Sequence, residues 1–165
     1  MLNVALYQPE IPPNTGNIIR LCANTGFTLH LIEPLGFSME DRELRRAGLD
    51  YHEYARVQVH PNLAALASHT DAARWFPFST RGRTPYFAPA YAPGDTLLFG
   101  PETRGLPDTV LNDARPQHRL RIPMLAQSRS LNLSNAVAIA AYAAWQQLAF
   151  AGAAPAGTGS TPDRS

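Results

Sequence analysis

The stretch Ser130-Leu131-Asn132-Leu133-Ser134-Asn135-Ala136-Val137 decides the fold of this chain more than any other. It follows a polar loop and opens an alanine-rich segment, which we predict to be a helix from Asn132 to Phe150. Alanine has the highest helix propensity, and its small side chain gives a helix a narrow body. So slim a helix can pack closely on a neighbouring backbone, or pass beside or through a tight loop.

Before this helix, short apolar runs alternate with helical patterns. This alternation predicts an α/β fold with a mainly parallel sheet and helices on both faces. The expected strands are Leu2–Tyr7, Thr28–Ile32, Val57–His60, Trp75–Ser79, Thr96–Phe99 and Leu120–Ile122. The strand at Val57–His60 should be half-exposed, and the one at Trp75–Ser79 should be weaker because it contains Pro77. Proline weakens a strand because it cannot donate a hydrogen bond to the ladder.

Helices are expected between these strands. Pro12-Pro13-Asn14 introduces a helix that runs to Thr25, with Asn14 as N-cap and Gly26 as the terminating residue. Ser38-Met39-Glu40-Asp41 resembles a capping box and opens a helix that Gly48 closes. Shorter helices are expected at Asn62–Ser68 and Asp108–Ala114.

Length and composition indicate one globular domain. The chain has 165 residues, of which 45% are hydrophobic, and a domain of this size can bury a stable core. We expect residues 1–150 to form the single domain. Residues 151–165 are rich in Ala, Gly, Pro, Ser and Thr, so we expect a disordered tail there.

Several kinds of site and location are disfavoured by composition. The chain has one cysteine, Cys22, and five scattered histidines, so we expect no metal site. No apolar run reaches the roughly 20 residues that span a bilayer, and the N-terminus lacks a basic signal-peptide region. We therefore expect a cytoplasmic protein. The net charge of +1 does not by itself indicate a nucleic-acid binder, although all 14 basic residues are arginine, whose planar fork suits phosphates.

Two further segments have the features of ligand sites. In Asn14-Thr15-Gly16-Asn17-Ile18-Ile19-Arg20, helical spacing puts Asn17, Arg20 and Asn24 on one polar face near the carboxyl end of the first strand. In Phe99-Gly100-Pro101-Glu102-Thr103-Arg104-Gly105-Leu106-Pro107, a buried strand runs into a glycine-punctuated loop that can approach a ligand closely. Taken alone, each segment is also compatible with an ordinary solvated surface.

Together, Asn14–Arg20, Phe99–Pro107 and Ser130–Ala136 resemble the three sequence motifs of the SPOUT 2′-O-methyltransferases. The resemblance covers residues 1 to about 150 and is greatest to the members that methylate the wobble nucleotide of tRNA, with a leucine tRNA as the expected substrate. It implies a deep trefoil knot near the C-terminal end, a homodimer, and S-adenosylmethionine as methyl donor without a metal. The donor is then expected to contact Phe78, Gly100, Ile122 and Ser130.

The same resemblance implies roles for other residues. Arg20 is the expected catalytic residue, and Asn132 is expected to order the site together with Ser134. The expected RNA contacts are Asn14, Asn17, Arg42, Arg45, Arg46 and Arg129. The family is usually described as using the first-motif arginine as the base, yet arginine stays protonated in proteins. Alternatively, Arg20 holds the adjacent phosphate, and that phosphate or a water accepts the proton.

Two other functions stay open at this point. One is the same reaction on another RNA, such as rRNA. The other is a non-catalytic RNA-binding protein that retains the donor pocket, although the intact set of Asn14, Asn17, Arg20 and Ser130–Asn132 disfavours it.

Overall fold

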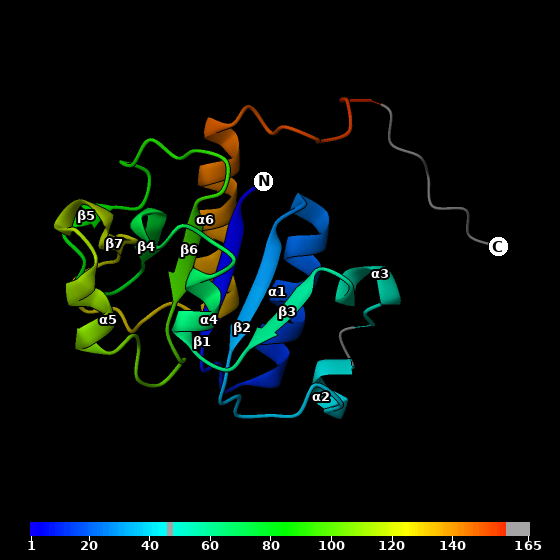
Figure 1. The fold of residues 1–165 in the computed structure, drawn as a ribbon. Coiled ribbons are helices and arrows are strands. Elements are labelled where there is room, and N and C mark those ends of the chain that lie inside the picture. Colours follow the sequence, from blue (N-terminus) through cyan, green and yellow to red (C-terminus); the bar gives the residue numbers. More distant parts are fainter. Residues whose placement is uncertain (46–47, 158–165) are drawn as a thin grey trace.

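A five-stranded parallel sheet forms the centre of the computed structural model, which describes residues 1–45 and 48–157 (Figure 1). Its strands are β1 (Asn3–Tyr7), β2 (Thr28–Ile32), β3 (Val57–His60), β4 (Trp75–Pro77) and β6 (Thr96–Phe99). They lie in the order β3-β2-β1-β6-β4, and each neighbouring pair is parallel. The predicted α/β class with a mainly parallel sheet is confirmed.

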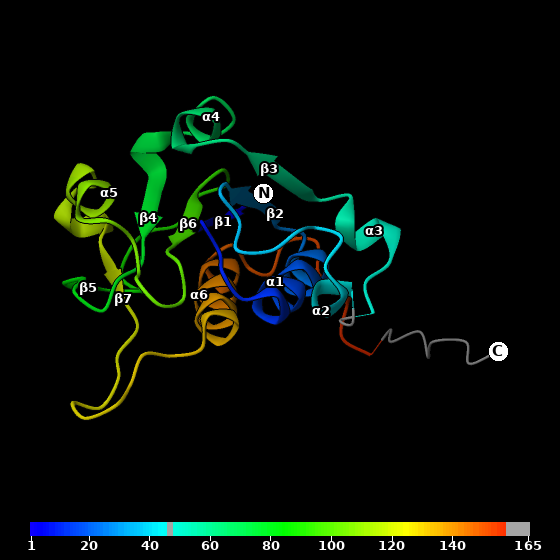
Figure 2. The same cartoon turned by 90° about the horizontal axis from the view of Figure 1, so that it is seen from below.

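Helices cover both faces of this sheet, as Figure 2 shows. On one face α1 (Pro12–Thr25) lies beside α6 (Leu133–Gln147), with α2 (Arg42–Arg45) and α3 (Tyr51–Tyr54) flanking α1. On the other face lie α4 (Leu63–Ala67) and α5 (Asp108–Asp113). Two 3-10 turns, η1 (Ala72–Arg74) and η2 (Pro116–His118), complete the helical elements of the described residues, and none of these helices is long and apolar enough to cross a membrane.

The apolar residues of β1 divide between two cores. Val4 and Leu6 belong to the larger cluster under α1 and α6, whereas Ala5 belongs to the smaller cluster under α4 and α5. This alternation arises because successive side chains of a strand point to opposite faces of the sheet. Since both faces are buried, the sequence of β1 is a continuous apolar run. In α6, Ala140, Ala141 and Ala144 are buried, so the predicted slim body does allow close packing.

The start of α1 differs from the prediction. Asn14 is not the N-cap; that position belongs to Ile11, which makes no side-chain cap bond. Pro12 and Pro13 have no amide hydrogen, so this helix start needs less capping than most. The Asn14 side chain is therefore available for contacts elsewhere. The predicted end is confirmed, because Gly26 has φ of 79° and its amide bonds the Cys22 carbonyl.

The predicted helix from Ser38 to Gly48 is confirmed in part: a helix is present within this range, but its start differs from the prediction. The Ser38 hydroxyl accepts from the amide of Glu40, which forms a turn instead of a helix start, and α2 begins only at Arg42. Positions 46 and 47 lie outside the described residues. The sequence also gave no expectation of α3, which a capping box between Asp50 and Glu53 stabilises.

Three other elements differ in their extent or partner. The sixth predicted strand is β7 (Leu120–Arg121), which pairs with the unpredicted β5 (Thr84–Pro85) in a separate two-stranded sheet. The predicted strand at Trp75–Ser79 stops at Pro77, at the sheet edge where proline is tolerated. Helix α6 ends at Gln147 and not at Phe150, because Ala149 and Phe150 have positive φ of 56° and 51°.

The expected tail begins with ordered contacts. Trp145 Nε1 donates to the Ala151 carbonyl, and the backbone amide of Ala153 donates to the Phe150 carbonyl. Residues 154–157 are exposed, and residues 158–165 lie outside the described residues. The tail at 151–165 therefore stays a prediction.

Three histidines form a cluster beside α4. His30 Nδ1 lies 2.9 Å from His60 Nε2, and His30 Nε2 lies 3.0 Å from Asn3 Oδ1. The His69 ring lies 5.0 Å from that of His60. Burial, together with the neighbouring imidazoles of His60 and His69, lowers the pKa of His30 from 6.5 to about 4. His30 is therefore neutral in the folded protein at neutral pH.

This cluster predicts acid sensitivity. Below pH 6.5 the unfolded chain binds a proton at residue 30 that the folded chain does not bind, so the free energy of unfolding should fall as pH drops towards about 4. The contribution of His30 should be on the order of 2 kcal/mol. Urea unfolding at several pH values should show a flatter profile for His30→Gln, whereas His52→Gln, at an exposed position, should keep the wild-type profile. Equal slopes for His30→Gln and wild type would contradict this.

Candidate functional site

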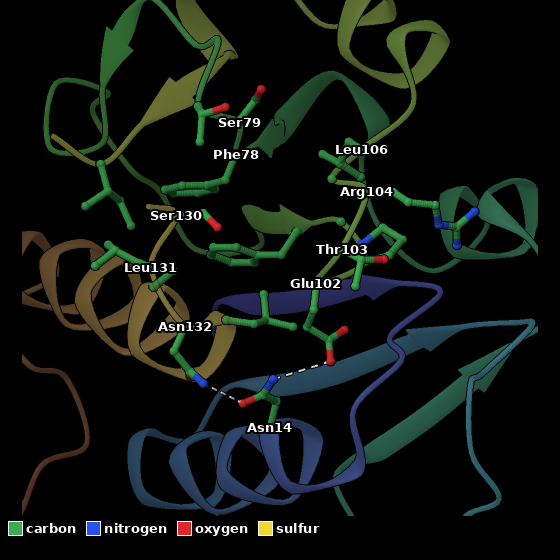
Figure 3. A pocket seen from close by; sticks show the side chains of 18 of the residues that line it. Asn14, Phe78, Ser79, Glu102, Thr103, Arg104, Leu106, Ser130, Leu131 and Asn132 are labelled. Carbon is green, nitrogen blue, oxygen red and sulfur yellow. Dashed lines mark hydrogen bonds between the residues drawn. The ribbon is translucent and has the colours of Figure 1, made fainter. Parts of the chain in front are cut away.

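A cavity of about 500 Å³ opens at the carboxyl ends of β4 and β6 (Figure 3). Ligand cavities in open parallel sheets lie at this edge, and the volume lies within the range of small-molecule sites. Its walls come from the start of α1, the loops after β4, β6 and β7, and the start of α6, namely Ile11, Asn14, Phe78–Arg81, Phe99–Leu106, Ile122, Met124, Ser130–Leu133 and Ala136.

The four residues predicted to contact a methyl donor all line this cavity. Phe78, Gly100, Ile122 and Ser130 come from four separate segments, yet the fold brings them together. Asn132, predicted to order the site, lies on the same wall. The sequence motifs thus meet at one place, while the role of each residue stays a prediction.

One side of the cavity is apolar. The rings of Phe78 and Phe99 stack with centroids 4.5 Å apart and an interplanar angle of 15°. Leu106 and Ile122 extend this surface. Phe99 and Leu106 lie within the predicted motif Phe99–Pro107, but neither was expected as a donor contact, because a buried apolar residue next to a glycine loop gives no signal of its own. Such a wall suits the flat face of a heterocycle.

The loop after β6 folds tightly at Gly100. A Cβ at this position would lie 2.3 Å from the amide nitrogen of Leu106, closer than any side chain allows. The Gly105 amide also donates to the Pro101 carbonyl at 2.9 Å. Glycine is therefore required where the loop turns back to form the cavity floor.

A chain of hydrogen bonds joins the three motif segments, and Figure 3 shows its central part. Asn132 Nδ2 donates to Asn14 Oδ1 at 3.0 Å, and Asn14 Nδ2 donates to Glu102 Oε2 at 3.3 Å. The Glu102 carboxylate also accepts from the backbone amides of Glu10, at 2.8 Å, and Ile11, at 2.6 Å. We name this arrangement of Asn132, Asn14 and Glu102 the amide bridge.

A reciprocal contact reinforces the amide bridge. Glu10 Oε1 accepts from the backbone amide of Thr103 at 3.0 Å and from its hydroxyl at 2.7 Å. These two hydrogen bonds lower the pKa of the Glu10 carboxyl. The β1–α1 and β6–α5 loops thus each bind the other through a carboxylate. Glu102, a candidate base if Arg20 is not catalytic, already accepts three hydrogen bonds here.

Asn132 has a second function as the N-cap of α6. Its Oδ1 accepts from the Ser134 amide at 2.9 Å, the Ser134 hydroxyl at 2.6 Å and the Asn135 amide at 3.4 Å. The bridge therefore fixes the start of α6 relative to the start of α1, and with it the cavity wall at Ser130 and Leu131.

Arg20 does not line the cavity of its own chain. It lies six residues after Asn14 on α1, which is about 120° around the helix axis. Its Nε donates to Glu53 Oε2 at 3.1 Å, and its Nη2 donates to the Gly48 carbonyl at 2.9 Å. The predicted polar face is confirmed, because Asn17, Arg20 and Asn24 are all exposed.

The fold brings together only some of the residues predicted to contact RNA. Arg42 and Arg45 are exposed on α2, where Arg45 pairs with Glu40. Arg129 is exposed in the loop between β7 and α6, whereas Arg46 lies outside the described residues. Asn14 is 6% exposed, with both amide atoms bonded in the bridge, so we correct its expected role to part of the cavity wall.

Two further arginines line the cavity. Arg81 pairs with Asp108, and Arg104 lies in the loop that Gly100 closes. Nothing in their sequence spacing separates them from surface arginines. Within residues 1–45 and 48–157, no group of three or more His, Cys, Asp or Glu side chains could hold a metal ion.

Comparison with known proteins places the chain in a family. The model of the SpoU rRNA Methylase family matches residues 1–142. The chain belongs to this family. A tRNA (cytidine(34)-2'-O)-methyltransferase of Aeromonas hydrophila is 59% identical over 152 residues, covering 92% of this chain and 97% of the relative.

Solved structures agree with this membership. A structure that gives insight into the 2-OH methylation of C/U34 on tRNA superposes with a TM-score of 0.83 at 47% identity, over 90% of this chain and 97% of the other. An AdoMet-bound rRNA methyltransferase from Sinorhizobium meliloti shares the fold, with a TM-score of 0.77 at 24% identity, over 89% of this chain and 56% of that one.

The amide bridge predicts a specific loss of stability in this family member. Glu102→Ala leaves the amides of Glu10 and Ile11 and the Asn14 side chain without their acceptor, so the free energy of unfolding should fall by about 2–3 kcal/mol. Glu40→Ala removes an exposed ion pair and should change it by less than about 0.5 kcal/mol. Urea denaturation measures both. A Glu102→Ala protein as stable as wild type would show that the bridge does not hold the loops.

Proposed function

We propose that this chain transfers a methyl group from S-adenosylmethionine to the ribose 2′-OH of the wobble nucleotide of tRNA, a cytidine or modified uridine, and that it does so in the cytoplasm. The observation that carries the proposal is the meeting of all three motif segments at one cavity, joined by the amide bridge. Support comes from the 59% identical relative, which acts on cytidine 34 of tRNA.

The lining of the cavity fits the donor. S-adenosylmethionine combines a flat heterocycle with hydroxyl and amino-acid groups, and it supplies a methyl group already activated on a sulfonium. The stacked rings of Phe78 and Phe99 offer an apolar surface for the heterocycle. Ser130 and the backbone of the Gly100 loop offer polar partners. Because the methyl group is activated, the reaction needs no metal.

The protein's own task is then to position groups and manage one proton. The 2′-oxygen bonds to the methyl carbon while the carbon–sulfur bond breaks, and its electron pair stays on sulfur. The proton of the 2′-OH must leave to an acceptor as the new bond forms. Holding the ribose and the donor in line supplies most of the rate gain.

Arg20 must reach this reaction from elsewhere, because it does not line its own chain's cavity. We therefore propose a homodimer in which Arg20 of one subunit faces the cavity of the other. The outer side of α6 supports this arrangement, since Ile139 and Tyr142 are 38% and 45% exposed. Large apolar side chains gathered on one face are characteristic of subunit interfaces.

A trefoil knot near the C-terminal end is also part of the proposal. The segment at Gly82 lies so close to β7 that a Cβ there would be 2.4 Å from the Leu120 carbonyl oxygen. The amides of Thr84 and Tyr86 donate to the carbonyls of Arg119 and Arg121. Such tight contact between the β4–β5 and β7 segments supports a threaded arrangement through which the slim α6 passes.

Contacts to RNA would come from the exposed arginines and from Asn17 on the polar face of α1. Asn17 and Arg20 lie on that face, and Arg42 and Arg45 lie on the adjacent α2. Arg129 is exposed in the loop between β7 and α6, next in sequence to Ser130 of the cavity lining. Most of the binding energy for RNA comes from contacts to phosphates. So few arginines would be enough to bind tRNA only if both subunits contributed such contacts.

The reaction can be tested by nucleoside mass spectrometry. The purified protein is incubated with donor carrying a deuterated methyl group and with bulk tRNA or rRNA. The label should appear as a 2′-O-methylated ribose in tRNA, at the wobble position, and not in rRNA. Label in rRNA alone would assign another RNA substrate, and no label in any RNA would favour a binding protein.

Arg20→Ala should abolish methyl transfer, because the catalytic group is lost. Donor binding should change little, since the cavity is built from other segments. Calorimetry with S-adenosylmethionine in chelator and a turnover assay on tRNA measure the two effects. Asn24→Ala, at an exposed position on the same face of α1, is the matched control and should keep turnover. Normal turnover of Arg20→Ala would contradict a catalytic role.

Tyr142→Glu should convert the dimer to monomer, because it places a charge in the proposed apolar interface. Turnover should fall with it, while donor binding persists. Val59→Glu is the matched control, since Val59 is 44% exposed on β3, an edge strand of the sheet. Light scattering at micromolar concentration gives the mass of each variant. A wild-type monomer with full activity would overturn the dimer.

A further inference from the structure

We propose that Glu53 is a positioning residue for the methyl transfer, and that it fixes Arg20 as a permanent cation, not as the proton acceptor. The inference rests on the proposed function, because it concerns how Arg20 acts in that reaction. In this proposal helix α3, which lies outside the three motif segments, contributes to the active site through Glu53.

Two acceptors hold the Arg20 guanidinium on two of its nitrogens. The Glu53 carboxylate accepts from Nε at 3.1 Å, and the Gly48 carbonyl accepts from Nη2 at 2.9 Å. Two bonds from different nitrogens define the plane of the guanidinium as well as its position. The side chain is 47% exposed, whereas that of Glu53 is 17% exposed, so the acceptor is the more rigidly placed partner.

Glu53 is itself fixed by the capping box of α3. Its amide donates to Asp50 Oδ1 at 3.0 Å, and its Oε1 accepts from the Asp50 amide at 3.4 Å. One carboxylate oxygen thus caps the helix while the other, Oε2, binds Arg20. Because the carboxylate is held at both oxygens, it cannot rotate away from the guanidinium without uncapping α3.

The second acceptor depends on a special backbone conformation. Gly48 has φ of 68°, a left-handed conformation that favours glycine. In this turn its carbonyl faces Arg20. The turn and the capping box come from residues 48–53, so one short segment provides both contacts.

In both contacts Arg20 acts as a hydrogen-bond donor, through Nε and Nη2. Arginine stays protonated in proteins, and a charge-assisted bond to a carboxylate is a strong one. A group arranged in this way is a poor proton acceptor. Among the described residues no other acceptor bonds the guanidinium, so its remaining N–H groups can grip a phosphate oxygen pair. The proton then passes to that phosphate or to a water beside it.

A contribution to folding stability does not explain the ion pair between Arg20 and Glu53. Ion pairs as exposed as this one contribute little to folding, because solvent screens them and ordering two long side chains costs entropy. What the contact does provide is orientation, which matters for a group that must meet a phosphate at a fixed distance from the donor.

The experiment compares Glu53→Ala and Glu53→Gln with wild type in turnover, tRNA binding and donor binding. Glu53→Ala should lower kcat on the order of tenfold to a hundredfold, because Arg20 loses its orientation. Glu53→Gln has a single acceptor oxygen, which can keep the contact to Arg20 only by giving up the bond from the Asp50 amide, so its kcat should lie between those of Glu53→Ala and wild type. Donor affinity should be unchanged in both variants.

Two matched controls separate orientation from other effects. Asp50→Ala breaks the same capping box but leaves the carboxylate that binds Arg20, so it should cost much less activity than Glu53→Ala. Asp113→Ala removes an exposed carboxylate on α5, on the other face of the sheet, and should be silent. Equal losses in Asp50→Ala and Glu53→Ala would show that only the order of α3 matters, which would overturn the proposal.

The pH dependence of turnover decides between cation and base. If Arg20 were the base, removing the Glu53 charge would ease its deprotonation and displace the pH–rate profile of Glu53→Gln to lower pH. A fixed cation predicts an undisplaced profile. A displaced profile, or wild-type kcat in Glu53→Ala, overturns the inference. Arg20→Ala measured in parallel keeps the two claims apart: if it is active, the catalytic role of Arg20 fails; if it is inactive while Glu53→Ala is normal, only the positioning role fails.

Discussion

The site depends on one small set of hydrogen bonds, those that Asn14 makes to Asn132 and Glu102. These bonds connect the start of the first helix to the loop after β6, 88 residues away in sequence, and to the start of the last helix, 118 residues away. Each partner is bonded further, Glu102 to backbone amides and Asn132 to the first turn of α6. Loss of one member would therefore leave several polar groups unpaired, among them an amide group of the buried Asn14, a larger cost than the loss of one contact.

Helix α1 serves two chemical purposes because its sides face different surroundings. Asn14 faces the cavity wall, and Arg20 faces the acceptors supplied by residues 48–53. The cavity and the Arg20 guanidinium are therefore held by separate sets of contacts. This separation supports the proposed dimer, in which the other subunit would bring the two together.

Much of this arrangement could be predicted from the sequence. Strand and helix periods located all the strands of the main sheet, and the motif resemblance located the cavity wall at Phe78, Gly100, Ile122 and Ser130. The predictions that failed concern features that are set by tertiary contacts. Asn14 looked like an N-cap because asparagine often is one, but two prolines remove that need and Glu102 supplies a better partner. Helix α3 was missed because four residues have too short a period to detect, and with it the contact between Glu53 and Arg20.

The central claim is that a complete site combines the cavity of one subunit with Arg20 of another. Mixing two inactive proteins tests it directly, one carrying Arg20→Ala and the other Asn132→Ala, after exchange of subunits. Half of the dimers are then mixed, and one of the two sites in each has both an intact cavity and an intact Arg20, so turnover should return to about a quarter of wild type. If the mixture stays as inactive as its components while subunit exchange is confirmed by mass, each chain works with its own Arg20, and the account is wrong.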